Sequence, residues 1–293
     1  MTYRAWELKN LDRAALRELT AAIAEQAAEE LEYNAQEGEP WSEQKYKAVL
    51  AAQQKENALL AGVLTARGVT DPTDALTLLA GEEELSDPFL LTDMQKACER
   101  IWRAIDDGET IVVFGDYDVD GTTAVALVYK YLQNFYSNIE YYIPSRSDDG
   151  YGISRKSIDY AAENNVKLII ILDCGIKAND EIRYAREKGI DFIICDHHMP
   201  DEELPEAVAI LNPKLPGNTY PCRDLSGCGV GFKFMQAFAK SNNFPFSDLE
   251  KLLELTAVSI ASDIVPITGE NRILAYYGLK QLNSNPSLGL KGI

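Results

Sequence analysis

The segment DYDVDG, residues 116–121, places three carboxylates two residues apart, at Asp116, Asp118 and Asp120. In extended backbone, side chains two residues apart face the same side, so we expect these carboxylates to converge. Carboxylates held this close repel one another, and a bound divalent cation relieves the repulsion. Gly121 then lets the chain turn into a helix, whose amino-terminal amides favour anions. The segment therefore predicts a divalent-cation site.

Two further segments carry residues of metal-ligand type. Asp173 begins DCG, and Asp196, His197 and His198 form DHH, which holds both of the chain's 2 histidines. Neighbouring side chains point in different directions in extended backbone, so one imidazole can bind a metal while the other faces a substrate. Mixed carboxylate and imidazole ligands suit Mn²⁺ or Mg²⁺. Two such ions would clamp a phosphate for in-line displacement, activate water and steady the leaving oxygen.

Each segment taken alone has a simpler interpretation. DYDVDG looks like part of a calcium-binding loop, but the last position of such a loop falls on Leu127 rather than on a glutamate. Asp173 alone fits a helix N-cap equally well, and paired histidines also occur in protein cores. The three segments in one chain favour the metal site.

Each of these segments follows a predicted strand. Continuously apolar runs alternate with helical stretches from residue 110 onward, which is typical of βαβ units and a buried parallel sheet. Ligands of such sheets bind beyond the carboxyl ends of the strands. We predict an α/β fold with helices on both faces of a parallel sheet. The predicted strands are 110–114, 139–143, 168–172, 192–195 and 208–211, and the predicted helices are 122–135, 154–164, 179–188, 229–240 and 247–262.

Helices also precede the sheet. Composition and breakers predict them over 11–33, over 41–67 with Gly68 as the C-cap, and over 92–106. We expect residues 1–105 to form a helical segment that serves as a lid or packing layer, and residues 106–282 to form a catalytic domain. Residues 283–293 resemble the start of a linker.

A glycine-rich segment, SGCGVGFK, precedes a later helix. It places Ser226, Gly227 and Gly229 before a helix that carries Lys233, a layout that cradles phosphate through backbone amides. Glycines also permit close helix packing, and that alternative stays open.

Two more features are less specific. Asp263, in ASDIVP, lies at a helix end before a proline and is either a cap or a further metal carboxylate. Cys222 and Cys228 have the look of a zinc pair, but no second pair accompanies them.

The charge of the chain excludes one way of binding nucleic acid. With 28 basic and 46 acidic residues its formal charge is −18, whereas proteins that grip nucleic acid by their general field are usually basic. A polyanion would need a local site, bound cations or a basic partner region. No apolar run is long enough to cross a membrane, the first residues lack a signal-peptide pattern, and 5 unevenly spaced cysteines indicate reduced thiols. We expect a cytoplasmic protein.

DYDVDG, DCG, DHH, SGCGVGFK and ASDIVP together resemble the motifs of the DHH phosphoesterase superfamily, and within it the bacterial exonucleases specific for single-stranded DNA. TARGV, DP, IPSR and GYGIS occur in the order typical of those enzymes, so the resemblance runs from about Ala61 to Pro286. It implies 5′-to-3′ hydrolysis of single-stranded DNA with two Mn²⁺ or Mg²⁺ ions, in recombination and repair. It also implies a single-strand-binding protein and a helicase as partners.

The resemblance implies roles for individual residues. Asp196 would orient a metal-binding imidazole, His198 would meet the scissile phosphate, and Arg146 would contact a phosphate through its fork of donors. Asp116 would be a supporting carboxylate beside the substrate. The residues that match the metal ligands are Asp118, Asp120, Asp173, His197 and Asp263.

The chain departs from this pattern in three respects. Many members carry histidine where this chain has Phe114, and residues 11–60 match nothing in them. Members also continue with an oligonucleotide-binding fold and a smaller domain with a Gly-Gly-His motif, which this sequence lacks. We therefore expect weak DNA binding by this chain.

Two other functions stay open. A phosphodiesterase or phosphatase of the same superfamily, acting on short oligonucleotides, cyclic dinucleotides or pyrophosphate, would share the metal core. A scaffold protein with a decayed site is the other, although the complete set of ligand residues speaks against it.

Overall fold

The computed structural model describes residues 13–35, 58–80, 84–146 and 152–292. The chain divides into two compact units, Met1–Glu84 and Leu85–Ile293. This division lies earlier than the expected boundary after residue 105, because α4 (Met94–Asp106) packs with the second unit. Among the described residues, no helix is both long and apolar enough to cross a membrane.

The first unit is helical, as the composition predicts. It contains α1 (Arg13–Ala35), a helix over 58–66 and α3 (Pro72–Ala80), and Leu19, Ala61, Leu64 and Ala75 form its core. Gly68 follows the second helix with φ +88°, as a C-cap glycine does. The sequence prediction missed α3, although Asp71 accepts hydrogen bonds from the amides of the first turn. The rest of the predicted helix 41–67 lies outside the described residues.

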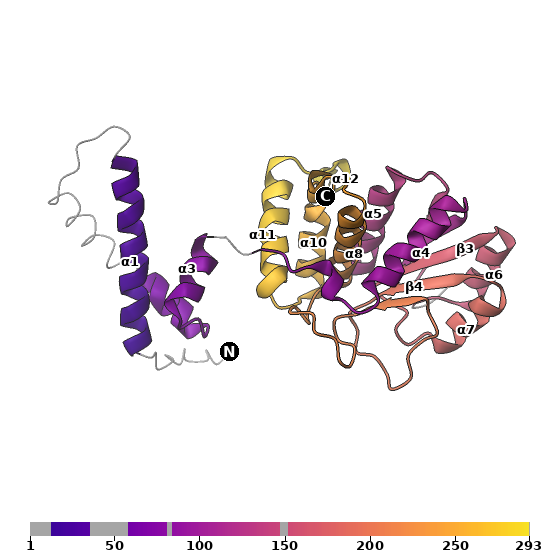
Figure 1. Cartoon of the computed structure of the whole chain (residues 1–293), viewed down its shortest axis with the longest axis horizontal. Helices are drawn as coiled ribbons and strands as arrows, with labels where there is room; N and C mark the ends of the chain where they lie inside the picture. The colour runs from indigo at the N-terminus through magenta and orange to yellow at the C-terminus, as the bar shows by residue number, and fades with distance from the viewer. Residues whose placement is uncertain (1–12, 36–57, 81–83, 147–151, 293) are drawn as a thin grey trace, which may run out of the picture. The chain divides into compact units, whose positions relative to one another are not determined.

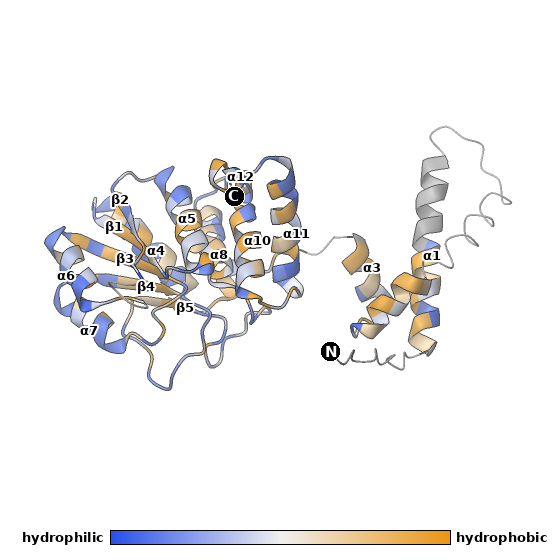
Figure 2. Ribbon diagram, turned by 180° about the vertical axis from the view of Figure 1, so that it is seen from behind, coloured by the Kyte–Doolittle hydropathy of each residue, from blue (hydrophilic) through white to orange (hydrophobic). Residues whose placement is uncertain are grey.

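The second unit (Figure 1) contains a five-stranded sheet whose strands are all parallel, in the order β2-β1-β3-β4-β5 labelled in Figure 2. All five strands were predicted, with differences of one or two residues at their ends, because each is a short, mostly apolar run bounded by helices or turn residues. The strands are β1 (Thr110–Gly115), β2 (Ile139–Tyr142), β3 (Val166–Leu172), β4 (Asp191–Cys195) and β5 (Ala209–Leu211).

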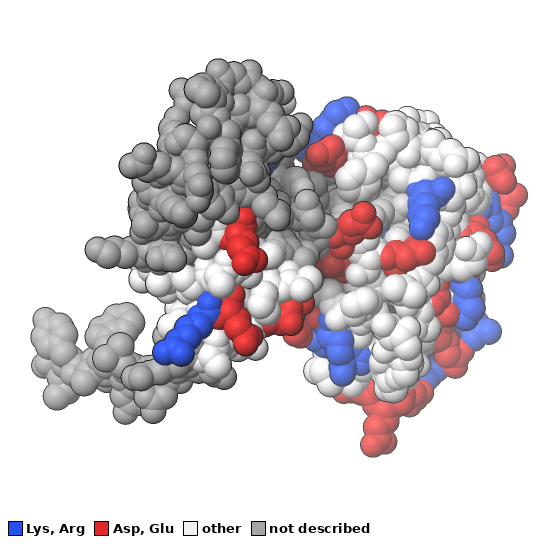
Figure 3. Space-filling view, turned by 60° about the vertical axis from the view of Figure 1, so that its left-hand side comes forward, with Lys and Arg blue, Asp and Glu red and all other residues white. Residues whose placement is uncertain are grey.

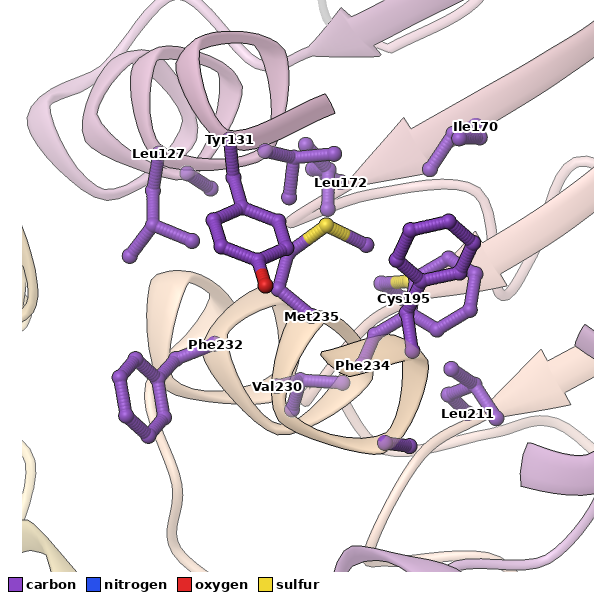
Figure 4. Close-up of a cluster of buried hydrophobic side chains, with 14 of the residues drawn as sticks. Leu127, Tyr131, Ile170, Leu172, Cys195, Leu211, Val230, Phe232, Phe234 and Met235 are labelled. Carbon is purple, nitrogen blue, oxygen red and sulfur yellow. The ribbon is translucent and has the colours of Figure 1, made fainter. Parts of the chain in front are cut away.

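Helices cover both faces of the sheet, which confirms the predicted fold class. The apolar character of the strands and of the helix faces that pack on them is visible in Figure 2. One face packs against α4, α5 (Val119–Gln133) and α8 (Gly227–Ser241), with α10 (Leu253–Asp263) packed on α5 and α8, and the other face packs against α6 (Arg155–Glu163) and α7 (Asn179–Glu187). Figure 4 shows the larger core, in which Tyr131 of α5 and Met235 of α8 meet Leu172 of the sheet.

The C-terminal part differs from the prediction in two places. The single helix expected over 247–262 is two helices, α9 (Phe246–Glu250) and α10. The expected linker is helical, because α11 (Gly269–Ser284) extends into it and α12 (Leu288–Gly292) follows. The amide of Ser287 donates to the Glu254 carboxylate at 3.0 Å, which ties this segment to α10.

Candidate metal centre

The site lies where the direction of the chain across the sheet reverses. Strands β1 and β3 are neighbours, yet α5 leaves β1 toward one face while α6 and α7 pack on the other (Figure 1). Such a switch point opens a crevice at the carboxyl ends of the strands. The register pairs Gly115 with Leu172 and Leu172 with Cys195, so the next residues, Asp116, Asp173 and Asp196, are brought side by side.

Helix α5 begins earlier than predicted, which changes the geometry of DYDVDG. Asp118 is the N-cap, with its carboxylate accepting from the Gly121 amide at 2.9 Å, and Asp120 lies in the first helical turn. The expectation of an extended segment with three carboxylates on one side was therefore wrong. Gly121 is not a turn residue; a Cβ there would lie 2.5 Å from the Asp116 carbonyl oxygen, so glycine permits the close approach of α5 to β1.

The structure brings together four of the five predicted metal ligands, namely His197 and three carboxylates around its ring. Its Nε2 lies 3.1 Å from Asp173 Oδ1, 3.7 Å from Asp120 Oδ2 and 3.7 Å from Asp263 Oδ2. Together with His198, these residues form two groups, each with three ligand atoms within 4.8 Å of one another. The first group is Asp173, His197 and His198, and the second is Asp120, His197 and Asp263. The fifth, exposed Asp118, caps α5 and belongs to neither group.

The donor atoms fit divalent cations. Asp173 Oδ1, Asp116 Oδ1 and both ring nitrogens of His197 are buried without a hydrogen-bond partner among the described residues. A buried polar atom without a partner costs about 1–3 kcal/mol, which ligation of a cation would offset. Burial, with the charges of Asp120 and Asp118, raises the pKa of Asp173 well above its usual range. A cation would relieve this repulsion.

Asp196 does not orient the metal-binding imidazole of His197, as predicted, but that of His198. Its buried carboxylate accepts from the amides of Ile176, His197 and His198, and Oδ1 lies 2.7 Å from Nδ1 of His198. Burial opposes ionisation of Asp196, but the hydrogen bonds and charge of His198 outweigh it and lower the pKa. The imidazole that Asp196 orients is therefore that of His198, whereas it reaches His197 only through the backbone amide.

The surroundings of the His198 side chain suit a proton donor that faces the solvent. Its hydrogen bond to Asp196 raises the pKa of the imidazole, although burial opposes this. Its side chain is 45% exposed, compared with 6% for His197. Because Nδ1 faces Asp196, Nε2 is the nitrogen left to meet a substrate.

Asp116 lies against the same crevice. It is buried at the end of β1, and burial is the main cause that raises its pKa, with the nearby charge of Asp118 adding to the effect. The preceding aromatic, Phe114, stacks on Tyr142 at 5.5 Å on the α6 face. This position therefore provides no ligand in this chain.

The predicted phosphate cradle at SGCGVGFK is occupied by a side chain of the protein. The amides of Gly227 and Cys228 donate to the two carboxylate oxygens of Asp120, each at 2.7 Å, and the Gly229 amide donates to Ser226 Oγ at 3.1 Å. The anion bound by the amino terminus of α8 is therefore Asp120. The phosphate-binding prediction for Ser226, Gly227 and Gly229 was wrong because these groups are already committed.

Lys233 does not face the crevice. It is fully buried, and its Nζ donates to the Ser86 carbonyl oxygen at 2.7 Å and to Glu270 at 3.0 Å. The hydroxyl of Tyr220 donates to the other oxygen of Glu270. Lys233 is part of a buried ion pair that joins α8 to α11, so the prediction that it binds phosphate was wrong.

Arg146 lies near the site, exposed, with its guanidinium 5.5 Å from the centre of the Tyr117 ring. Its contact with a phosphate stays a prediction. Sequence reasoning missed Ser259, which donates to Asp120 at 2.7 Å from α10. Its only sequence signal was its place one helical turn before Asp263.

Comparison with known proteins agrees with this geometry. Residues 110–260 match the family model described as DHH family, N-terminal domain. This segment covers more than half of the chain and includes the strands and most of the site. The chain belongs to the DHH family.

Members of the DHH family with assigned activities resemble the chain over most of its length. It is 40% identical over 234 residues to the single-stranded-DNA-specific exonuclease RecJ of Bacillus subtilis, a match that covers 80% of this chain and 29% of that relative. It is 36% identical over 204 residues to RecJ of Escherichia coli, covering 66% of this chain and 35% of that relative. The chain thus spans about a third of the length of these relatives.

A solved structure matches the fold as well. The crystal structure of RecJ from Thermus thermophilus in complex with Mn²⁺ has a TM-score of 0.67 and 25% identity, covering 80% of this chain and 33% of that one. Together with the donor set around His197, this relationship supports a site for Mn²⁺ or Mg²⁺ in this DHH domain.

Proposed function

We propose that this chain is the catalytic part of a metal-dependent 5′-to-3′ exonuclease that degrades single-stranded DNA. The observation that carries the proposal is the cluster of donors around His197, whose Nε2 lies 3.1 Å from Asp173 and 3.7 Å from both Asp120 and Asp263. His197 would bind one ion through this nitrogen, and the two oxygens of a carboxylate such as Asp173 can bridge a pair of divalent ions a few ångström apart. RecJ of Bacillus subtilis supports the choice of substrate.

The residues would divide the work according to their position around His197. Asp120, Asp173, His197 and Asp263 would hold the ions, with Asp118 and Asp116 as further carboxylates at the entrance. When bound, two such ions polarise a phosphodiester and lower the pKa of water. His198 would contact the scissile phosphate through Nε2, held in place by Asp196, and would donate a proton to it.

The distribution of surface charge supports recognition of DNA at the metal site rather than along an extended basic surface. Acidic and basic side chains are interspersed over the described face shown in Figure 3. The formal charge of −18 repels a polyanion at long range. Bound cations and Arg146 would therefore supply most of the attraction for the phosphates next to the scissile bond.

A first experiment tests the nuclease activity. The chain is incubated with Mn²⁺ and linear single-stranded DNA labelled at the 5′ or the 3′ end, and with circular single-stranded DNA. We expect early release of the 5′ label, late release of the 3′ label and no cutting of the circle. The Asp173→Asn protein is the control for contaminating nucleases, and early release of the 3′ label would contradict the proposed polarity.

A second substrate series separates the two enzyme functions that share the metal core. Dinucleotides, cyclic dinucleotides and pyrophosphate are compared with a long single-stranded oligonucleotide under the same conditions. Faster turnover of the small phosphoesters would assign the chain to the phosphatase alternative. If neither this chain nor a version extended to the length of its relatives hydrolyses any of these substrates, the scaffold alternative would be favoured.

A further inference from the structure

The carboxylate of Asp120 accepts hydrogen bonds from three donors on two helices. Oδ1 accepts from the Cys228 amide and from Ser259 Oγ, and Oδ2 accepts from the Gly227 amide, each at 2.7 Å. Oδ2 also faces Nε2 of His197 at 3.7 Å. An ionised carboxylate offers about four lone-pair positions, two on each oxygen. Two donors occupy both lone-pair positions of Oδ1. Oδ2 accepts one hydrogen bond, so its second lone-pair position, which faces His197, remains available.

The hydroxyl of Ser259 is itself held by a second hydroxyl. Ser226 Oγ lies 2.6 Å from Ser259 Oγ and accepts from the Gly229 amide at 3.1 Å. Each hydroxyl has one proton to donate. Ser259 Oγ lies within donating distance of both Asp120 Oδ1 and Ser226 Oγ, so its proton is shared between these two acceptors. The result is a buried network of hydrogen bonds that joins Gly229, Ser226, Ser259 and Asp120, in which the bonds polarise one another.

Helix α10 thus contributes twice to the same group of donors. Ser259 and Asp263 are four residues apart and therefore lie on one side of the helix. Ser259 and Ser226 are fully buried, and the Ser259 hydroxyl fixes Asp120 while Asp263 faces His197. One turn of α10 supplies a ligand residue and the hydroxyl that holds another ligand in place.

We infer that Ser259 is a positioning residue for one of the two metal ions, namely the ion that Asp120, His197 and Asp263 would share. It holds Asp120 so that only Oδ2 is available for ligation. Asp173, which would anchor the other ion, makes no hydrogen bond with Ser259 among the described residues. This inference rests on the proposed function, because it assumes that the chain binds two divalent ions.

If the Ser259 hydroxyl had only a structural role, a different result would be expected. Loss of such a hydroxyl would lower the free energy of unfolding and weaken both metal positions together or neither. Loss of a positioning hydroxyl weakens one position and leaves the other. Thr256 offers a matched control, because it is also a fully buried hydroxyl residue of α10 that faces α8, with Oγ1 3.9 Å from Cys228 Sγ.

The test compares Mn²⁺ binding by wild type, Ser259→Ala and Thr256→Val, measured by calorimetric titration and by the electron paramagnetic resonance of free Mn²⁺. We expect two binding events in wild type. In Ser259→Ala one of them should weaken by about 10-fold or more, the usual effect of removing a group that orients a ligand, and the other should stay within about twofold. Thr256→Val should retain both affinities within about twofold.

A double-mutant cycle tests whether the effect acts through Asp120. In the Asp120→Asn background, Ser259→Ala should cause no further loss of Mn²⁺ affinity, because the residue it positions is already changed. Ser259→Cys, with a weak donor of similar size, should give an intermediate affinity, and it replaces Ser259→Ala if that variant does not fold.

The possible results are distinguishable. Equal weakening of both events, or two unchanged events in Ser259→Ala, would overturn the positioning role while the metal-dependent function stands. A wild-type chain that binds no Mn²⁺ would overturn both the inference and the proposed function. Selective loss of one event, absent from Thr256→Val, would support the inference whether or not this chain cleaves DNA.

Discussion

Nε2 of His197 lies 3.1 Å from Oδ1 of Asp173, and both atoms are buried without a hydrogen-bond partner among the described residues. Their elements are adjacent strands, β4 and β3, which the register of the sheet aligns. Asp173 adopts the left-handed conformation, with φ 59°, at the point where the chain leaves β3. The sheet therefore presents two ligand atoms side by side at a distance that a shared cation would fill.

We expect Asp173→Asn to reduce hydrolysis of single-stranded DNA by at least about 100-fold, because the variant removes a charged ligand rather than a group that merely supports one. Asparagine tolerates the left-handed backbone conformation as aspartate does, so the fold should be preserved. The rate of nucleotide release at saturating Mn²⁺ measures the effect. Asp159→Asn, which changes a half-buried carboxylate on α6 that pairs with Lys188 and lies outside the site, is the control. Retention of full activity by Asp173→Asn would disprove the two-metal proposal.

We expect His198→Ala to slow turnover while Mn²⁺ affinity stays within about threefold of wild type. The exposed imidazole is held by Asp196 through Nδ1 and presents Nε2 to the substrate. Single-turnover rates and calorimetric Mn²⁺ titration separate the two effects. A large loss of Mn²⁺ affinity would instead make His198 a ligand of the group that contains Asp173 and His197.

The stability of the metal-free protein should fall as the pH rises above about 4, the usual pKa of an unfolded aspartate. Burial and the charges of Asp120 and Asp118 raise the pKa of Asp173, so the folded protein keeps a proton that the unfolded chain releases. Mn²⁺ requires the ionised carboxylate, so its stabilising effect should grow with pH. Thermal unfolding at a series of pH values from about 5 to about 8, with and without Mn²⁺, measures both trends.

Asp173→Asn provides the control for this pH dependence, because the amide does not titrate. Its metal-free stability should change less with pH than that of wild type. A Mn²⁺ effect that is equally large at both ends of this pH range in wild type would show that proton release from Asp173 does not accompany metal binding.

We expect Lys233→Met to destabilise the fold by about 3–5 kcal/mol, because it leaves the Glu270 carboxylate buried without its cation. Denaturant unfolding measures this loss. The second change Glu270→Gln should recover part of it, because the amide carries no charge. A Lys233→Met protein with wild-type stability but weaker DNA binding would restore the phosphate-binding role that the structure does not support.

Several elements could be predicted because one local signal decides them. The inner strands β1, β3 and β4 are apolar runs whose burial leaves no competing pattern. Helix ends were harder, because they depend on single capping contacts. Asp118 starts α5 by accepting the Gly121 amide, which is compatible with the sequence but not required by it. The expected linker contains enough turn residues to resemble a loop, yet α11 extends into it, α12 follows, and the Ser287 amide between them donates to Glu254 of α10.

The sequence by itself determined the chemistry of this protein. It placed carboxylates and imidazoles directly after apolar strands, and strands of a parallel sheet bring their carboxyl ends to one edge. That was enough to predict that Asp173, His197 and the DYDVDG segment meet.

Only the tertiary structure decided which partner each group takes. The amino terminus of α8 can bind any anion, and the chain supplies Asp120 from 107 residues away. The ammonium of Lys233 can pair with a phosphate or a carboxylate, and the packing of α8 against α11 delivers Glu270. Hydrogen bonds and ion pairs depend on distance and direction in space, and residue types and local spacing contain neither for groups so far apart along the chain.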